Sequence, residues 1–423
     1  MTHEIPEGWA ETTVGSISEI ITKGTTPTTS GFGYRTEGIP FIKAENIDDH
    51  GNIGEPTAFV SDECHSAFRR SIIKKDTILF TIAGTLGRVA VYKDQSEANT
   101  NQAVALIKGI NQDLSYVAYY LQCPRIKKLV EEQKTTGAQP NISLTQLKNF
   151  PISLPPQHEQ KKIAEVLSSV DETIAATKAV IDQTNQVKKG LVQNLLTKGI
   201  GHTRFKQTEL GEIPESWEVV ELGDLVEALK AGVSVNSENR TIRDNEAGIL
   251  KTSCVTNGFF DAAEHKAILS HELARAKNPV KADSIIISRM NTPALVGANA
   301  YVSQDYPNLF LPDRLWQLSV KDTDKTLVRW LSFVFASYNM RARMSGIATG
   351  TSGSMKNISK AKLLSLLVAV PKKYEQIEIS EILSSFEQEL GILQRYIAEL
   401  QSLKTGVMSE LLSGKKRVEV GDV

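Results

Sequence analysis

Few residues of this 423-residue chain have the types and spacing that catalysis needs. It has no Gly-x-x-x-x-Gly-Lys-Ser/Thr loop for nucleotide phosphates and no Asn/Asp-Pro-Pro-aromatic element to hold a flipped adenine. Gly31-Phe32-Gly33 lacks a strong strand before it and is predicted to be a surface turn. After Pro312-Asp313, no acidic residue and lysine follow at a spacing suited to metal-assisted hydrolysis. We therefore predict no catalytic residue, metal site or cofactor site in this chain.

The remaining chemistry is recognition by hydrogen bonds from basic and amide side chains. Arginine and lysine pair with guanine, and asparagine and glutamine pair with adenine, each good bidentate pair adding ~1 to 3 kcal/mol of discrimination. Each such residue taken alone is also explained as ordinary solvated surface. The candidates for DNA contact, chosen on predicted loops, are Lys23, Arg35, Lys43, Asn46, Arg69, Arg70 and Arg88, then Arg240, Arg243, Lys251, Asn257, Arg289 and Asn291.

Two long helices are predicted to position these residues, because apolar side chains recur at alternating steps of four and three. This is a coiled-coil seam, in which polar residues cost stability and fix register; Thr177, Thr184 and Lys188 take such positions. The first helix follows Pro155-Pro156 and ends at Gly199, and the second runs from about Pro371 to Gly414. The predicted seam residues are Ile163, Leu167, Val170, Ile174, Ile181, Leu191, Leu195, Ile379, Leu383, Phe386, Leu390, Leu393, Ile397, Leu400, Val407 and Leu411.

Two helices of matched length and seam are expected to pair. About 40 residues at ~1.5 Å each make a helix ~60 Å long. If the two pair antiparallel, each carries a globular head at opposite ends of a pseudo-twofold arrangement. Major-groove sites on one face of B-DNA recur every ~34 to 36 Å, so such heads would suit two half-sites about one turn apart. A generic dimerisation coiled coil is the alternative.

The chain contains an internal duplication. Ile5-Pro6-Glu7-Gly8-Trp9 returns as Ile213-Pro214-Glu215-Ser216-Trp217, 213 − 5 = 208 residues later, and Asn141-Ile142-Ser143 returns 216 residues later as Asn357-Ile358-Ser359. Residues 155–170 and 371–386 are identical at 8 of 16 positions. This period is too long for a solenoid, whose units run ~20 to 50 residues. The ends of each half therefore do the same job twice while the middles differ, although an old duplication without functional division is also possible.

The rest of each half is predicted to be α+β. In the first half, β-rich runs at 41–42, 77–82, 89–92 and 103–107 precede a helical pattern from 117 to 130 that breaks at Pro124. The second half repeats this plan with β-rich runs at 284–287 and 315–318 and a helical pattern from 327 to 334. The predicted division is a first head at 1–155, a helix at 156–201, a second head at 202–370, and a helix with a tail at 371–423.

Composition is that of an ordinary globular protein, with 41% hydrophobic residues, 23% charged residues and a net charge of −1. Any DNA footprint must therefore be local. Cys64, Cys123 and Cys254 are far apart and odd in number, which indicates neither a disulfide framework nor a zinc cage. The longest apolar run, Leu363 to Val370, is too short to span a bilayer. We expect a cytoplasmic protein that does not associate with membranes.

The tandem Ile-Pro-x-x-Trp openings, the Asn-Ile-Ser elements, the Pro-x-x-x-Glu-Gln-x-x-Ile-x-x-x-Leu helix starts and the Gly-x-x-x-x-Leu-Leu helix ends resemble the specificity subunits of type I restriction-modification enzymes. The resemblance covers nearly the whole chain; no single motif is specific, but their duplicated order is distinctive. It implies two tandem target recognition domains, each reading one half of a split, asymmetric site in double-stranded DNA.

The same resemblance implies partners. The helices would set the spacer and dock two methyltransferase subunits, and restriction subunits, which are also translocases, would join that core. The assembled complex would be an adenine-N6 methyltransferase and an ATP-dependent endonuclease. S-adenosylmethionine, ATP and Mg are then expected only on the partner subunits.

Two other functions remain open from the residues alone. The heads of an interaction scaffold would bind protein or another ligand while the helices oligomerise; DNA affinity that falls steeply with salt would argue against it. A self-sufficient methyltransferase or nuclease would be active alone with its cofactor. The sequence does not disclose the bases read, because loops of one composition support many codes.

Overall fold

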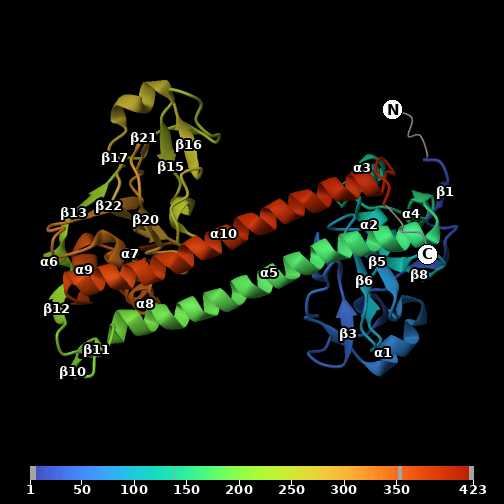
Figure 1. Ribbon diagram of the computed structural model, residues 1–423, viewed down its shortest axis with the longest axis horizontal. Coiled ribbons are helices and arrows are strands. Elements are labelled where there is room, and N and C mark those ends of the chain that lie inside the picture. The colour runs from blue at the N-terminus through green and yellow to red at the C-terminus, as the bar shows by residue number, and fades with distance from the viewer. Residues whose placement is uncertain (1–5, 138, 351–354, 419–423) are drawn as a thin grey trace. The chain divides into compact units, whose positions relative to one another are not determined.

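The computed structural model describes residues 6–137, 139–350 and 355–418. Ile5, which opens the first repeated motif, lies outside the described residues. The chain divides into two compact units, Met1–Ala179 with Gln394–Val423, and Val180–Leu393. Helices α5 (Gln157–Lys198) and α10 (Lys373–Leu411) each contribute residues to both units (Figure 1). Each unit thus combines one head with part of each long helix.

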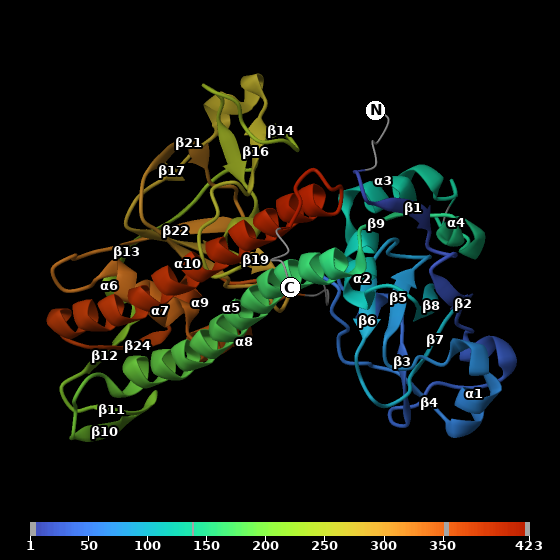
Figure 2. The same ribbon diagram turned by 45° about the vertical axis from the view of Figure 1, so that its right-hand side comes forward.

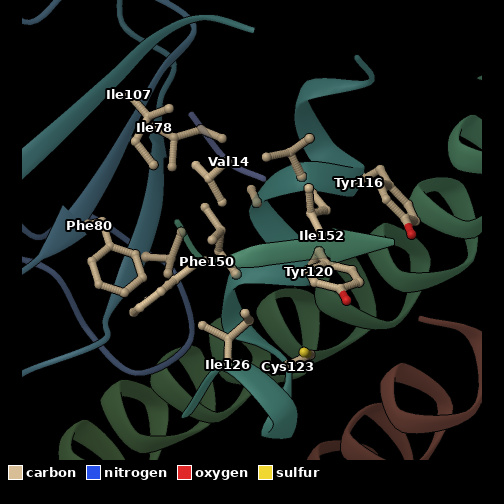
Figure 3. Packing of buried hydrophobic residues seen from close by; sticks show 14 of the residues in the cluster. Val14, Ile78, Phe80, Ile107, Tyr116, Tyr120, Cys123, Ile126, Phe150 and Ile152 are labelled. Atoms are coloured by element: carbon tan, nitrogen blue, oxygen red, sulfur yellow. The ribbon is translucent and has the colours of Figure 1, made fainter. Parts of the chain in front are cut away.

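The first head is built on an antiparallel sheet in the order β2-β8-β5-β6, with strands Ser18–Lys23, Val104–Ile110, Thr77–Thr81 and Val89–Tyr92. Helices α2 (Leu114–Gln122) and α3 (Pro124–Gln133) contribute to the same core and are separated at Pro124, as predicted. Phe80 and Phe150 meet edge to face in this core, with ring centroids 6.1 Å apart (Figure 3). Because Ile163 and Leu167 of α5 belong to the same apolar cluster, the head and the helix share one core.

Smaller elements complete the first head. Strands β4 (Phe59–Val60), β3 (Ile39–Ile42) and β7 (Asn99–Thr100) form a second sheet, in which β3 and β7 are parallel. Strand β1 (Ala10–Thr13) pairs with β9 (Pro151–Leu154) immediately before α5. The helical turns are η1 (Pro27–Ser30), η2 (Ala44–Asn46), α1 (Asp62–Ala67), η3 (Arg69–Ser71) and α4 (Leu144–Lys148).

The second head has the same framework. Its main sheet has the order β13-β22-β18-β20, with strands Val226–Ala231, Leu315–Val320, Ser284–Ser288 and Asn299–Val302. Helices α7 (Val328–Ala336) and α8 (Tyr338–Ile347) take the places of α2 and α3 (Figure 2). Strands β12 (Glu218–Glu221) and β24 (Leu367–Val370) pair before α10 as β1 and β9 pair before α5.

The second head differs from the first in its smaller elements. Its second sheet has five strands in the order β14-β16-β15-β21-β17: Ser237–Glu238, His265–Ile268, Gly248–Leu250, Tyr306–Phe310 and Pro279–Val280. The remaining elements are β10 (Phe205–Thr208), β11 (Gly211–Pro214), α6 (Leu222–Leu225), η4 (Thr252–Val255), η5 (Ser270–Arg275), β19 (Met290–Asn291), β23 (Lys356–Asn357) and α9 (Lys360–Leu364).

The duplication extends to details of the backbone. Gly24 follows β2, and a Cβ there would lie 2.1 Å from the Thr100 carbonyl oxygen. Gly232 follows β13, and its Cβ would lie 1.5 Å from the Leu311 carbonyl oxygen. Only glycine fits where two backbones approach so closely. The predicted α+β fold with a tandem internal repeat is thereby confirmed.

Within each unit the two long helices run antiparallel. In the first unit Asp171 of α5 lies 2.7 Å from Lys404 of α10, and Glu159, earlier in α5, lies 2.7 Å from Arg417, which follows α10. In the second unit Lys188 lies 3.0 Å from Glu387. The backbone N–H of Ile200, which follows α5, donates to Glu375 near the start of α10. The predicted antiparallel pairing is therefore confirmed within each unit.

Every predicted seam residue is buried or half-buried. Those buried most completely are Ile163, Leu167, Ile379 and Leu383, each with no exposed surface. The others are Val170, Ile174, Ile181, Leu191, Leu195, Phe386, Leu390, Leu393, Ile397, Leu400, Val407 and Leu411.

Candidate nucleic-acid interface

The residues that sequence analysis considered for catalysis have ordinary structural contacts. Gly31 ends η1 in the left-handed conformation with φ 82°, which makes it the predicted turn. Asp313 accepts a hydrogen bond from the Ser234 hydroxyl, and its backbone carbonyl accepts one from Arg289 at 2.7 Å. Across residues 6–137, 139–350 and 355–418, no group of three His, Cys, Asp or Glu side chains is placed to hold a metal ion. Nor is any described helix long and apolar enough to cross a membrane.

All three cysteines are buried and free. Burial raises the pKa of the thiols of Cys64, Cys123 and Cys254, which keeps them protonated. A protonated buried thiol is a poor nucleophile, so these cysteines have packing roles.

A group of basic residues gathers on the first head where β2 ends. Lys23 is the last residue of β2, and Arg69 and Arg70 lie on η3; all three are exposed. Arg70 Nη2 donates a hydrogen bond of 3.4 Å to the hydroxyl of Thr25, which joins the two segments. Among the described residues none of the three has an acidic side chain within salt-bridge distance. Their charges are therefore available to an anionic ligand.

Lys108 belongs to this group and was not a candidate from the sequence. It lies on β8, and its Nζ donates to the backbone carbonyls of Ile72 at 2.6 Å and Arg70 at 3.4 Å. Burial lowers the pKa of Lys108, and the positive charge of Lys74 lowers it further. Lys108 thus anchors the segment that carries Arg69 and Arg70. We name Lys23, Arg69, Arg70 and Lys108 the first basic cluster.

The other candidates of the first head are engaged within the protein to different degrees. Arg88 makes two hydrogen bonds to the Asp49 carboxylate, at 2.9 and 3.1 Å, and one to the Ile47 carbonyl. Asn46 Oδ1 accepts from the backbone N–H of Lys43 at 2.9 Å, and its amide donates to the Glu55 carbonyl.

Lys43 and Arg35 keep more of their hydrogen-bonding capacity. Lys43 Nζ lies 3.6 Å from Glu45 and 5.0 Å from the ring centroid of Tyr34. Arg35 is exposed, and its backbone pairs with Phe59. Among the first-head candidates, the side chains of Arg88 and Asn46 make the most hydrogen bonds within the head.

Among the candidates, the cations of the second head are more often paired than those of the first. Arg240 is bound by Glu238 at 2.7 Å and by Glu246 at 2.6 Å. The hydrogen bonds from Arg240 lower the pKa of Glu246 to about 2, so this pair stays ionised at neutral pH. Lys251 lies 3.6 Å from Glu264. These two cations are therefore largely neutralised by their partners.

The remaining second-head candidates divide into anchored and exposed residues. Arg289 lies 5.6 Å from the Trp316 ring centroid and donates to the Asp313 carbonyl, and Asn291 donates to the Ser288 hydroxyl at 3.2 Å. Arg243 and Asn257 are exposed. Lys277, which was not among the candidates predicted from the sequence, is exposed after η5 as Arg70 is exposed on η3. The strands that follow, β5 and β18, begin 284 − 77 = 207 residues apart, and Arg70 and Lys277 are separated by the same number of residues.

Comparison with protein families gives a match in both halves of the chain. The model of the family described as "Type I restriction modification DNA specificity domain" matches residues 6–186 and again residues 214–402. Each match contains one head and continues into the long helix that follows it.

Curated relatives match over nearly the full chain. The putative type I restriction enzyme MjaX specificity subunit of Methanocaldococcus jannaschii is 26% identical, over 98% of this chain and 95% of the relative. The MjaVIII specificity subunit of the same organism is 27% identical, over 98% and 94%. The EcoKI specificity subunit of Escherichia coli is 23% identical, over 89% and 81%.

Two solved structures have the same fold. One is a chain from a study of complex assembly and conformational transition of the type I R-M system, with TM-score 0.58, 16% identity, and coverage of 98% of this chain and 100% of that chain. The other is a type I restriction-modification S subunit from M. genitalium, with TM-score 0.56, 15% identity, and coverage of 97% of each chain.

Proposed function

The chain belongs to the type I restriction-modification DNA specificity family, and from this premise we propose that it directs partner subunits to one split, asymmetric sequence in double-stranded DNA. It carries two copies of the DNA specificity domain. Each head reads one half-site, and the paired helices hold the two heads at a set spacer.

The observation that carries this proposal is that the two heads share a framework but differ in their exposed residues. Their main sheets have the same strand order, β2-β8-β5-β6 and β13-β22-β18-β20. The first head offers Lys23, Arg69 and Arg70, whereas the second offers Arg243 and Asn257. Since sequence is read by side chains at base edges, two equivalent frameworks with different side chains suit two different half-sites.

The proposal extends to partners. Two methyltransferase subunits dock on this chain, and restriction subunits, which are also translocases, join them in the cytoplasm. The chain itself performs no catalysis and holds no cofactor. S-adenosylmethionine, ATP and Mg are bound by the partner subunits. The names of the relatives, which are specificity subunits of type I restriction enzymes, support this division of labour.

The test is single-molecule methylation sequencing of DNA from cells that express this chain with its cognate methyltransferase subunit. Cells that express the methyltransferase subunit alone serve as the control. The expected result is adenine methylation at one split motif that is present only with this chain, which reveals both half-sites and the spacer. An unchanged pattern, despite a formed complex, would remove the DNA-specificity proposal and favour an interaction scaffold.

A further inference from the structure

In the first unit, one side chain of the head joins an ion pair between the two long helices. Lys404 of α10 lies 2.7 Å from Asp171 of α5. The hydroxyl of Tyr119, on helix α2 of the head, donates to the same Asp171 carboxylate at 2.8 Å and lies 3.2 Å from the Ser168 hydroxyl. Lys404 Nζ also lies 5.2 Å from the Tyr119 ring centroid. Head, α5 and α10 therefore meet at one carboxylate, and we name Tyr119, Asp171 and Lys404 the first junction.

The second unit contains the equivalent arrangement. Lys188 of α5 lies 3.0 Å from Glu387 of α10. Arg329, on helix α7 of the head, pairs with the same Glu387 carboxylate and donates to the Ser384 hydroxyl at 3.1 Å. We name Arg329, Glu387 and Lys188 the second junction.

The two junctions are copies of one another. Asp171 and Glu387 are 387 − 171 = 216 residues apart, and so are Lys188 and Lys404, and Ser168 and Ser384. The carboxylate comes from α5 in one junction and from α10 in the other, with the lysine on the opposite helix each time.

The head supplies a different side chain in each copy, but that side chain binds the equivalent helix carboxylate. Because α2 starts at 114 and α7 at 328, a difference of 214, the counterpart of Tyr119 is Phe333. Phe333 has no hydroxyl to donate. Arg329, one turn earlier on α7, lies 4.4 Å from the Phe333 ring centroid and supplies the hydrogen bonds instead. One donor was replaced by another, but the contact to the helix carboxylate is present in both copies.

Burial makes these junctions more sensitive to the loss of one member than surface ion pairs are. Lys404 is 8% exposed, although lysine is rarely buried unless it is paired. Asp171, Lys188, Arg329 and Glu387 are all half-buried. Exposed ion pairs contribute little because water and salt screen them, whereas a partly buried pair that loses one member leaves an unpaired charge.

We propose that the two junctions are positioning devices that fix each head on both helices at once and thereby determine the spacer between the half-sites. This inference rests on the proposed function. A displacement of one helical turn is ~5.4 Å, more than the ~3.4 Å rise of one base pair. A shift of a head by one turn along its helices would therefore change which spacer the chain accepts.

The test compares methylation by the assembled complex on DNA duplexes that carry the cognate spacer or a spacer one base pair shorter or longer. The variants are Asp171→Lys, Lys404→Asp and the double exchange of both. The matched control is the exchange Lys162→Glu with Glu165→Lys on α5, an exposed pair 3.4 Å apart. Tyr119→Phe removes only the hydroxyl that reaches Asp171, and it serves if the charge variants do not fold.

We expect each single charge variant to lower the preference for the cognate spacer about tenfold, in line with the coupling of close charge pairs, and the double exchange to restore it. The control exchange keeps the wild-type preference, and Tyr119→Phe lowers it to a smaller extent. Single variants that keep the preference in a formed complex would overturn the proposal, as would a double exchange that restores nothing. Wild-type protein that directs methylation to no split site would instead refute the proposed function, so the two failures are distinguishable.

Discussion

Arg70 and Arg88 both belong to the first head, but their guanidinium groups have different surroundings. Arg70 is exposed and has one long hydrogen bond to the Thr25 hydroxyl, whereas Arg88 is bound by Asp49 and by a backbone carbonyl. An arginine already paired with a carboxylate would have to break that pair before it bound phosphate. The first basic cluster is therefore a better candidate for DNA contact than Arg88.

We expect Arg70→Ala to weaken DNA binding by the assembled complex. If Arg70 binds a phosphate, the slope of log affinity against log salt falls by about one. Arg88→Ala, the comparison variant, leaves the salt slope at the wild-type value, because the Arg88 guanidinium is already paired with Asp49. The measurement is a binding titration at several salt concentrations with unfolding curves for each variant. Equal losses of affinity in both variants would contradict this assignment.

The sequence predicts residue types better than it predicts pairing. Arginines and asparagines on loops could be identified, but the bond between Arg88 and Asp49 joins residues 39 apart and depends on the fold. Arg240 and Glu246 are only six residues apart, but both lie outside any helix, so no periodic spacing predicted their contact. Lys108 follows a run of four buried residues in β8. This pattern gave no indication that its ammonium group donates to the backbone carbonyls of Arg70 and Ile72.

At the scale of the elements, the long helices are also part of the heads' cores. Leu167 of α5 has no exposed surface and lies in one apolar cluster with Tyr116 and Phe150 of the head. Val187 of the same helix is 52% exposed. Both are aliphatic residues on one helix, so they form a matched pair for mutation.

We expect Leu167→Ala to reduce the free energy of unfolding by ~2 to 5 kcal/mol, the range for emptying a packed site. Val187→Ala changes it by less than ~0.5 kcal/mol, as is usual on a surface. Urea unfolding of the full-length chain measures both. Similar values for the two variants would mean that α5 is not part of the head's core.

Periodicity was sufficient to predict the helices but not their junctions. The residues predicted by the steps of four and three are all buried or half-buried, and the steps also place Lys188 within the seam, but they did not predict the buried Met408 of α10. They do not predict that Glu387 is its partner, because pairing depends on the direction of the second helix. They also give no indication of Arg329, which reaches Glu387 from a different element.

At the scale of the whole molecule, the duplication predicted the tandem fold. The loops explain where the number of residues between equivalent positions of the two halves changes. Between the main sheet and the next helix, the first head has three residues, 111–113, and the second has seven, 321–327. This insertion increases the separation between equivalent residues of the two halves without changing the strand order. The five-stranded second sheet of the second head could not be predicted, because its short strands lie in the part where the two halves diverge.

Because the two heads have separate cores on equivalent frameworks, we predict that a substitution in one head alters recognition of one half-site only. We expect Arg243→Ala or Asn257→Ala to relax the bases accepted at one half of the methylated motif and to leave the other half and the spacer unchanged, because each head has its own core. Arg69→Ala should relax only the opposite half. Methylation sequencing of cells with each variant measures all three quantities. If one substitution changed both half-sites, the heads would be coupled, and the separation of two readers on one chain would have to be abandoned.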